Sequence, residues 1–579
     1  MATIAPPKLA EKELPLIERK KFGEEEIEVA YRMSPQDSGQ GLYYAPFNPS
    51  VTVDNGIICE QDVAVTLRDG TVIYTDVYRP EGATNLPAII AWSPYGKRHG
   101  YAPKDVQTFL ALGVPPGTNS PGTKFEGPDP AYWCHQGYAV LNPDVRGSGH
   151  SQGDLLYIGT QDGRDGYDFI EWAAQQPWSS GKVSMFGNSW LAMVQWWIAA
   201  EKPPHLTCIA AWEGTSDMYR EFVCTGGIPQ IGFNSFLLDF QRGPGRIEDA
   251  VAMIKKYPLM NAYWEDKIPH FENIDIPASI TAGWSHFHLR GSIMGYQKIA
   301  SKKKWLRIHR DMEWPDSYKP EHLEDLKRFF DRYLKGIRNG WEMTPKVRFD
   351  VMDAADVDYQ VERPEKEWPL ARTQYTQLFL DAKTGRLSPD RPKQPSSMRY
   401  ESTKGQAEFT MTFDEETELT GHMKLRLWVT ADGADDMDLF VAVQKLDESG
   451  KFLPTLILGE PYPGAPGLMR VSHRELDENQ STPYQPVQTH RREQLLKPKE
   501  IVSVDIEIYP SSRIWHAGEQ LRVVVSGHYL RDGWGWFEPF AWDLRNKGDH
   551  IVYTGAEYDS YLLVPVVPPK LKARNYAYR

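Results

Sequence analysis

Residues 56–80, GIICEQDVAVTLRDGTVIYTDVYRP, alternate apolar and polar positions on both sides of Arg68-Asp69-Gly70. Such alternation around an Asp-Gly pair predicts a β-hairpin with its turn at these residues. Two apolar runs follow, LPAIIAW at 86–92 and YAVLN at 138–142. Each is typical of a strand that is buried on both faces, so this part of the chain predicts a sheet.

Segments with helical spacing alternate with these strands. Residues 163–178 form an amphipathic pattern, and residues 190–200 are apolar without Gly or Pro, which predicts a buried helix. Between them, GKVSMF at 181–186 predicts a buried strand. Further strands and a last amphipathic helix are predicted at 206–214, 277–292, 303–314 and 320–336. Short strands that alternate with helices indicate a doubly wound α/β sheet.

These patterns divide the chain into four parts. Residues 1–55 are rich in Pro and charge and are expected to form an N-terminal arm over the body. Residues 56–215 and 276–350 are expected to form the α/β core. Residues 216–275 carry helical patterns and no strand run, which predicts an inserted helical cap. From 351 to 579 short strands are separated by turns, which predicts a β-sandwich of jelly-roll type.

A serine stands where the strand at 181–186 meets the helix at 190–200. Gly187-Asn188-Ser189 forms a Gly-x-Ser turn at this junction. A sharp strand-to-helix turn would lift Ser189 Oγ out of the sheet and direct the first N–H groups of the helix at whatever Oγ attacks. The same residues also suit a serine that only caps the helix, so the turn by itself is weak evidence for catalysis.

The composition of the chain restricts which partners and which cellular location are expected. The 65 Lys and Arg against 78 Asp and Glu give a net charge of −13, which argues against a nucleic-acid partner. The four cysteines have no metal-type spacing and are expected to be reduced thiols of a cytoplasmic protein. Residues 1–20 lack a basic-then-apolar leader, and no apolar run reaches about 18 residues, so secretion and membrane association are not expected.

A wider pattern extends from about residue 56 to residue 565. Its segments are VTLRDGTVIYTDVYRPEG, SPYGK, GYAVLNPDVRGSGHSQG, QQPWSSGKVSMFGNSW, RFFDRYLKGIRNGW and EIYPSSRIWHAGEQLRVVVSG. In this order they resemble the family of X-prolyl dipeptidyl aminopeptidases and cocaine-esterase-like α/β-hydrolases. The resemblance implies an α/β-hydrolase core, a helical cap and a C-terminal all-β jelly-roll of galactose-binding-like type.

The resemblance also implies chemistry by a Ser-His-Asp triad in which Ser189 is acylated and then deacylated. It assigns the oxyanion donors to the Trp190 N–H and to the hydroxyl of Tyr95 in its Pro-Tyr turn. Two preorganised donors at about 3 Å from a developing oxyanion stabilise it by a few kcal/mol each. Tyr95 could otherwise be an ordinary turn tyrosine.

The acid of the triad departs from the family pattern. The family places an aspartate in a Gly-Trp-x-Asp context, and here His286 takes that place in Gly283-Trp284-Ser285-His286. No aspartate occurs between Asp275 and Asp311. The usual acid is therefore absent or supplied from elsewhere.

The base has two candidates. A match to a Lys-Trp-Leu-x-x-His strand end makes His309 the base, and we expect His309 to contact Ser189 Oγ. A stricter match puts Glu313 at the histidine position of the family. That match permits an exchanged arrangement, with His286 as the base and Glu313 or Asp311 as its partner.

These residues predict a serine hydrolase that acts on an ester or amide of a small molecule, with Ser189, His309 or His286, Tyr95 and Trp190 as catalytic residues. Two other functions stay open. One is acyl transfer or cyclisation through the same serine, and the other is ligand binding or acid–base chemistry without acylation. A peptidase is less favoured, because only Glu213 or Asp217 could bind a peptide amino terminus.

No metal or organic cofactor is expected. His286 and His288, two residues apart on a predicted strand, would point to opposite faces and make a poor metal pair. The sequence DGADDMD around Asp435 suits a solvated turn better than a calcium site. The cap and a Gly- and Pro-rich flap at 103–133 would set specificity, so the substrate is not predicted. The aromatic-rich composition is compatible with a homodimer.

Overall fold

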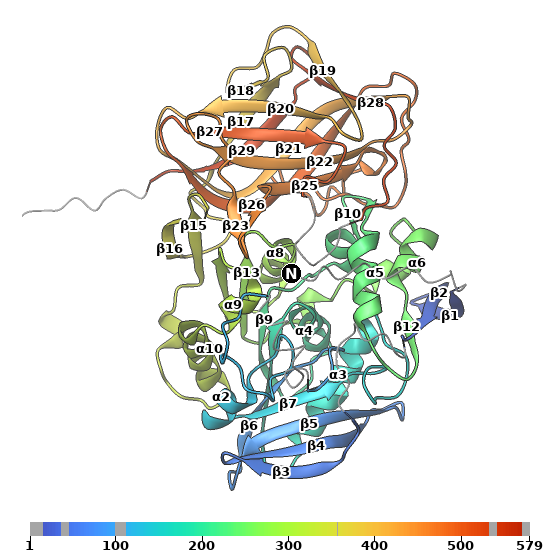
Figure 1. Ribbon diagram of the computed structural model, residues 1–579, viewed down its shortest axis with the longest axis vertical. Helices are drawn as coiled ribbons and strands as arrows, with labels where there is room; N and C mark the ends of the chain where they lie inside the picture. The colour runs from blue at the N-terminus through green and yellow to red at the C-terminus, as the bar shows by residue number, and fades with distance from the viewer. Residues whose placement is uncertain (1–14, 36–45, 99–111, 356, 532–540, 570–579) are drawn as a thin grey trace, which may run out of the picture. The chain divides into compact units, whose positions relative to one another are not determined.

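The computed structural model describes residues 15–35, 46–98, 112–355, 357–531 and 541–569 (Figure 1). The chain forms two compact units. The first comprises residues 1–348 together with two later segments, 457–460 and 531–544, and the second comprises the rest. The predicted flap at 103–133 lies partly outside the described residues, since it is described only from residue 112 onward.

The first unit contains a mixed sheet. Its neighbouring strands are, in order, β3 (Ser50–Asp54), β4 (Ile57–Thr66), β5 (Val72–Pro80), β7 (Ala139–Asp144), β6 (Leu86–Ile90), β8 (Ser179–Asn188), β9 (Leu206–Trp212), β13 (Ala278–Gly283) and β14 (Lys304–His309). The pairings from β3 to β7 are antiparallel, and those from β7 to β14 are parallel. The predicted α/β sheet is confirmed.

The predicted hairpin and buried helix are also confirmed. β4 and β5 pair antiparallel, and Gly70 in their turn has a φ of +86°, a value that favours glycine. Helix α4 (Trp190–Ala200) has the predicted bounds and is buried from Trp190 to Ala199. The other helices of the core are α2 (Pro130–His135), α3 (Thr160–Ala174), α8 (Leu289–Lys298), α9 (Glu313–Ser317) and α10 (Pro320–Tyr333).

The predicted cap at 216–275 is largely helical. It contains a π-helical turn (Met218–Val223), α5 (Ile231–Phe240), α6 (Ala250–Lys256), α7 (Ala262–Glu265) and a 3₁₀ turn (Phe271–Asn273). The expectation that it carries no strand is wrong, because it also holds β10 (Cys224–Thr225), β11 (Ile228–Pro229) and β12 (Arg246–Glu248). Strands of two or three residues are too short to show alternation in the sequence.

The N-terminal residues pair with this cap. β1 (Leu16–Phe22) and β2 (Glu25–Met33) form an antiparallel hairpin, and β12 adds to its β2 edge. Ala541 also contacts the cap: its carbonyl O accepts hydrogen bonds from the N–H groups of Ile231 and Gly232, each at 2.9 Å. The start of α5 is thus held by a residue more than 300 positions away in sequence.

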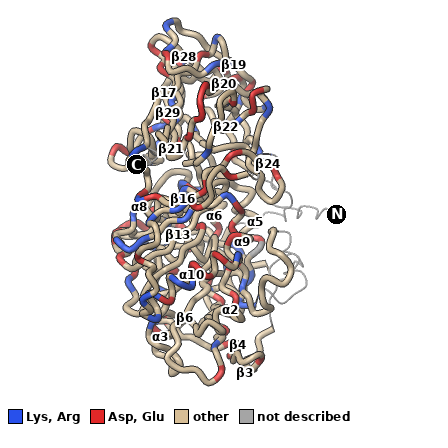
Figure 2. Tube along the Cα trace, turned by 90° about the vertical axis from the view of Figure 1, so that its left-hand side faces the viewer, with Lys and Arg blue, Asp and Glu red and all other residues tan. Residues whose placement is uncertain are grey.

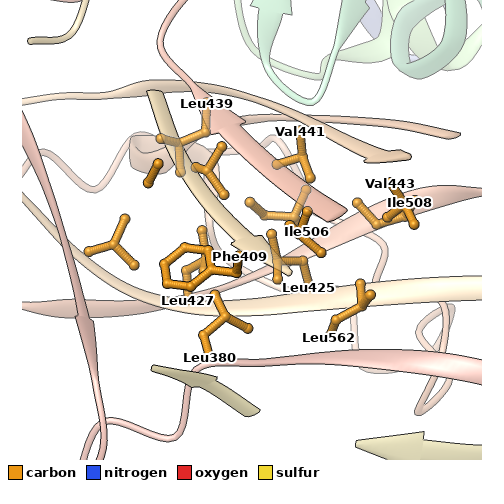
Figure 3. Close-up of a cluster of buried hydrophobic side chains, with 14 of the residues drawn as sticks. Leu380, Phe409, Leu425, Leu427, Leu439, Val441, Val443, Ile506, Ile508 and Leu562 are labelled. Carbon is orange, nitrogen blue, oxygen red and sulfur yellow. The ribbon is translucent and has the colours of Figure 1, made fainter. Parts of the chain in front are cut away.

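The second unit is all β, as predicted. Its strands include β17 (Gln374–Asp381), β20 (Gln406–Thr412), β21 (Thr417–Asp432), β22 (Asp438–Leu446), β25 (Ala465–Arg470), β26 (Val502–Trp515), β27 (Gln520–Ser526), β28 (Asp549–Thr554) and β29 (Tyr561–Val567). β21 pairs with β26, β28 and β29, while β27 pairs with β20 and β22. Both sets of strands contribute to one buried cluster, where Phe409, Leu425 and Ile506 lie together (Figure 3).

Charge is mixed along the chain. Figure 2 shows Lys and Arg interspersed with Asp and Glu along the described trace. Among the described residues, no helix is both long and apolar enough to cross a membrane.

The cluster in Figure 3 predicts the effect of a core substitution. Phe409→Ala removes a fully buried ring and should lower the free energy of unfolding of the second unit by about 3–5 kcal/mol. Gln406→Ala, at an exposed position of the same strand, should change it by less than about 0.5 kcal/mol. Chemical denaturation of the full chain measures both. Equal effects of the two substitutions would contradict the burial of Phe409.

Candidate active site

Ser189 occupies a sharp turn between β8 and α4. Its backbone has φ 52° and ψ −118°, a conformation that a non-glycine residue adopts at a cost of about 1–3 kcal/mol. Gly187 makes the turn possible, because a Cβ there would lie 2.5 Å from Leu191 Cδ2 and 2.8 Å from Glu126 O. Ser189 is partly exposed although Asn188 and Trp190 on either side are buried. The turn therefore presents this serine at the edge of the sheet.

Three backbone hydrogen bonds align the strand ends around Ser189. The Ser189 N–H donates to Glu213 O at 3.0 Å, and the Glu213 N–H donates to Thr281 O at 2.8 Å. The Trp284 N–H then donates to His309 O at 2.8 Å. The carboxyl ends of β8, β9, β13 and β14 consequently lie side by side, which is where open α/β sheets bind ligands.

His288 is the imidazole that contacts the serine. Its Nε2 lies 3.1 Å from Ser189 Oγ, and its Nδ1 lies 2.9 Å from Thr215 Oγ1. Burial lowers the pKa of His288 to about 3, so the ring is neutral at pH 7. A neutral ring that donates from Nδ1 to the Thr215 hydroxyl leaves Nε2 free to accept the Ser189 proton.

The expected contact between His309 and Ser189 is not made. His309 ends β14, and β9 and β13 lie between that strand and β8. Its Nε2 instead lies 2.7 Å from Glu213 Oε1. Burial alone would lower the pKa of His309, but the Asp316 and Glu213 carboxylates outweigh burial and raise it. The His309 ring therefore faces the buried carboxyl group of Glu213 and not Ser189.

His286 lies behind His288, between two carboxyl groups. Its Nδ1 is 3.8 Å from Glu213 Oε2, and its Nε2 is 3.7 Å from Glu313 Oε1. Its Nδ1 also accepts the N–H of His288 at 3.3 Å. Burial, followed by the nearby His288 and Arg531, lowers the pKa of His286 well below its usual value. His286 and Glu313 therefore lie close together, as the exchanged arrangement expects. The ring that contacts Ser189, however, is that of His288.

The predicted strand at 277–292 ends earlier than expected. β13 stops at Gly283, where a Cβ would lie 2.9 Å from Glu213 Oε2, and the chain then turns into α8. His286 and His288 both lie in this turn, with ring centroids 4.7 Å apart. The expectation that they point to opposite faces of a strand is therefore wrong.

The sequence offers Asp311 and Glu313 as carboxyl partners of a histidine base, and of these two only Glu313 lies beside His286. Asp311 pairs with Lys319, and its side chain is 31% exposed. Glu313 is buried, and burial together with Glu213 and Glu126 raises its pKa well above the usual value. Burial also raises the pKa of Glu126 to about 8, although the Trp314 indole donates to it at 2.9 Å. The carboxyl groups of Glu313 and Glu126 thus both resist ionisation.

Tyr95 and Trp190 both lie beside the serine, as expected. Tyr95 follows β6, and its ring packs edge-to-face on Trp190 with centroids 6.3 Å apart. Burial raises the pKa of Tyr95 well above its usual value, while hydrogen bonding to the Ser189 side chain acts in the opposite direction. Trp190 is the first residue of α4, so its N–H belongs to the free donors of a helix N-terminus.

Sequence reasoning did not assign roles to His288 and Thr215. Both follow a strand of the parallel sheet by a few residues, and the convergence of strand ends is the signal that could have found them. Helix α8 brings them together: Ser292 Oγ accepts the Gly214 N–H at 3.0 Å. A Cβ on Gly291 would lie 2.5 Å from Thr215 Cα, so glycine is required for this approach.

A mixed α/β sheet whose parallel strands hold a strand-to-helix serine against an imidazole is the arrangement of the α/β-hydrolase fold. Comparisons with known proteins name the family. Residues 69–243 match the X-Pro dipeptidyl-peptidase (S15) family, and residues 339–563 match the X-Pro dipeptidyl-peptidase C-terminal non-catalytic domain. A CocE/NonD family hydrolase from Staphylococcus aureus is 37% identical with a TM-score of 0.83, over 88% of this chain and 94% of that one. The chain belongs to this family of hydrolases.

More distant relatives agree with the fold. Cocaine esterase from Rhodococcus sp. (strain MB1 Bresler) is 24% identical over 388 residues, which is 57% of this chain. The match spans 63% of that esterase, less than two thirds of its length. An α-amino acid ester hydrolase is 16% identical with a TM-score of 0.65, over 92% of this chain and 99% of that one, and shares the fold.

The close contact at Gly291 predicts the effect of adding one methyl group. Gly291→Ala should lower the free energy of unfolding of the first unit by about 1–3 kcal/mol, because the new Cβ overlaps Thr215. Gln297→Ala, at a less buried position of the same helix, is the control and should have little effect. Chemical denaturation measures both variants. A Gly291→Ala protein as stable as the wild type would show that Thr215 does not pack against α8.

Proposed function

We propose that the chain is a serine hydrolase that cleaves an ester or amide of a small molecule through an acyl-enzyme on Ser189. The observation that carries the proposal is the 3.1 Å approach of His288 Nε2 to Ser189 Oγ at the strand-to-helix turn. Membership of the hydrolase family supports it. His288 takes the role that the sequence assigned to His309 or His286.

The chemical steps follow from the positions of these groups. As Ser189 Oγ attacks the carbonyl carbon, its proton passes to His288 Nε2. The negative oxygen of the tetrahedral intermediate accepts hydrogen bonds from the Tyr95 hydroxyl and the Trp190 N–H. When the intermediate collapses, His288 gives the proton to the leaving group. Water then attacks the acyl group by the same sequence and releases the acid.

Thr215 makes this site slower than one with a carboxylate. A carboxylate at Nδ1 orients the ring and also stabilises the imidazolium that forms during attack. The Thr215 hydroxyl can orient the ring through its 2.9 Å contact, but it carries no charge. Because burial already disfavours protonated His288, we expect a slow or specialised enzyme.

Aromatic rings surround the serine and favour an apolar acyl group. Tyr157 packs edge-to-face on Trp190 with centroids 6.0 Å apart, and Phe222 stacks on His288 at 6.3 Å. The same surroundings favour a second candidate function, acyl transfer to a bound hydroxyl or amine, because apolar walls disfavour water as the acceptor. All four cysteines are free thiols, which supports a cytoplasmic site of action.

The decisive experiment compares the histidines at the strand ends. His288→Ala should slow single-turnover acylation of Ser189 by a nitrophenyl ester about 10²- to 10⁴-fold, because the general base is lost. His309→Gln should retain most of the rate, since His309 contacts Glu213 and not Ser189. Ser189→Ala is the control that must abolish fluorophosphonate labelling.

The outcomes separate the candidate functions. Labelling of Ser189 with continued release of acid supports hydrolysis. Labelling with one burst of nitrophenol, followed by turnover only when an alcohol or amine is added, supports acyl transfer. A normal rate in His288→Ala with a loss in His309→Gln would overturn the assignment of the base.

The role of Thr215 can be tested by two matched substitutions. Thr215→Val keeps the shape but removes the hydroxyl, so His288 Nδ1 loses a buried partner worth about 1–3 kcal/mol, or about 10- to 100-fold in acylation rate. Thr215→Ser keeps the hydroxyl and should recover most of this loss. Equal rates in both variants would show that the hydroxyl does not position His288.

A further inference from the structure

The turn after β13 and the start of α9 bring three metal-binding side chains together. Donor atoms of His286, His288 and Glu313 all lie within 4.8 Å of one another, and the three residues are buried. His286 Nε2 and Glu313 Oε1 are 3.7 Å apart. Ligand atoms around tetrahedral Zn²⁺, at about 2.0–2.1 Å from the metal, are separated by about 3.3 Å, so small side-chain shifts would complete the geometry.

The remaining nitrogens of both histidines face oxygen atoms. His286 Nδ1 lies 3.8 Å from Glu213 Oε2, and His288 Nδ1 lies 2.9 Å from Thr215 Oγ1. Metal-bound histidines donate their second N–H to just such carboxylate or hydroxyl oxygens, which fix the ring and its tautomer. Ligation through Nε2 of His286 would replace the 3.3 Å contact from the His288 amide with an Nδ1–H directed at Glu213.

Glu313 has an unused donor atom in this place. Its Oε2 is buried and has no hydrogen-bond partner among the described residues, and the same holds for Glu126 Oε2. Buried carboxyl groups without partners are costly unless they are neutralised or bind a cation. The titratable and charged groups that face the cluster are the carboxyl groups of Glu126, Glu213 and Glu313, the His309 ring and the Arg531 guanidinium. A bound cation would displace a proton from Glu313 and take its place beside the carboxyl oxygens.

We propose that His286, His288 and Glu313 form a binding site for a divalent transition-metal ion such as Zn²⁺, and that the bound ion inhibits the hydrolase. Two imidazoles and one carboxylate suit such an ion better than Mg²⁺ or Ca²⁺, which prefer oxygen ligands. The Nε2 atom of His288 cannot bind the ion and accept the Ser189 proton at the same time. Inhibition rests on the proposed function, whereas metal binding does not.

A second group of potential ligands in the described part of the chain provides a control. Asp353, His516 and Glu519 of the second unit also bring donor atoms within 4.8 Å. The Lys445 ammonium pairs with Asp353 and lies 2.8 Å from Glu519 Oε2, so a cation already neutralises these carboxylates. We therefore expect one metal site per chain at low metal concentration, not two.

Calorimetric titration of the chelator-treated full chain with Zn²⁺ tests the proposal directly. The wild type should bind one ion, and His286→Ala should weaken binding by at least about 10-fold. Loss of a residue that only hydrogen-bonds to a metal ligand already weakens metal binding by about 10-fold or more, and loss of a ligand should cost at least as much. Ser189→Ala and His516→Ala should bind as the wild type does. Because Ser189→Ala has no nucleophile, its binding is independent of the proposed function. Circular dichroism checks that each variant is folded.

Activity measurements test the second half of the proposal. Zn²⁺ should slow fluorophosphonate labelling of the wild type in parallel with its occupancy, and chelator should restore the rate. Relative to its own rate in metal-free buffer, labelling of His286→Ala should resist inhibition by Zn²⁺ in proportion to its weaker binding. Absence of binding to the wild type, unchanged binding by His286→Ala, or loss of binding only in His516→Ala would each overturn the site. Binding without slower labelling would overturn the inhibitory role.

Discussion

The site depends on three backbone hydrogen bonds that continue the parallel sheet just beyond its strands. They join Ser189 to Glu213, Glu213 to Thr281, and Trp284 to His309. Because each bond fixes the first residue after a strand, the side chains that follow are held at one edge within reach of one another. The strained backbone of Ser189 persists since its N–H is bonded here and its carbonyl is used by the first turn of α4.

Burial decides the electrostatics of this edge. Glu213 stands at its centre, close to His309 on one side and to His286 on the other. Burial raises the pKa of Glu213 even though His309 opposes that shift, and Glu126 and Glu313 are raised as well. The base at the serine, His288, is neutral for the same reason. At Glu126, Glu213, Glu313 and His288, exclusion of water therefore determines the direction of the pKa shift, whereas at His309 the neighbouring carboxyl groups outweigh it.

Sequence patterns predicted most of the fold and part of the site. Alternation and apolar runs located the strands, and the bounds of α4 agree with its uninterrupted apolar sequence. Ser189 was found because the turn geometry is encoded locally by Gly187. His288 was not, because its role depends on where β13 ends and on the close approach of Gly283 to Glu213, a residue 70 positions away in the chain. Thr215 likewise acquires its partner only through packing against Gly291.

The two units are not separated by a single cut between residues 348 and 349, because residues from later in the chain also belong to the first unit. Ala541 belongs to the first unit although it follows most of the second in sequence, and its carbonyl accepts hydrogen bonds from the N–H groups of Ile231 and Gly232 that open α5. A fragment that stops at residue 348 would lose this acceptor, and so would a chimera in which another sandwich replaced the residues from 349 onward. The start of α5 therefore depends on a residue near the far end of the chain, and any exchange of domains that keeps α5 in place must carry Ala541 along with residues 1–348.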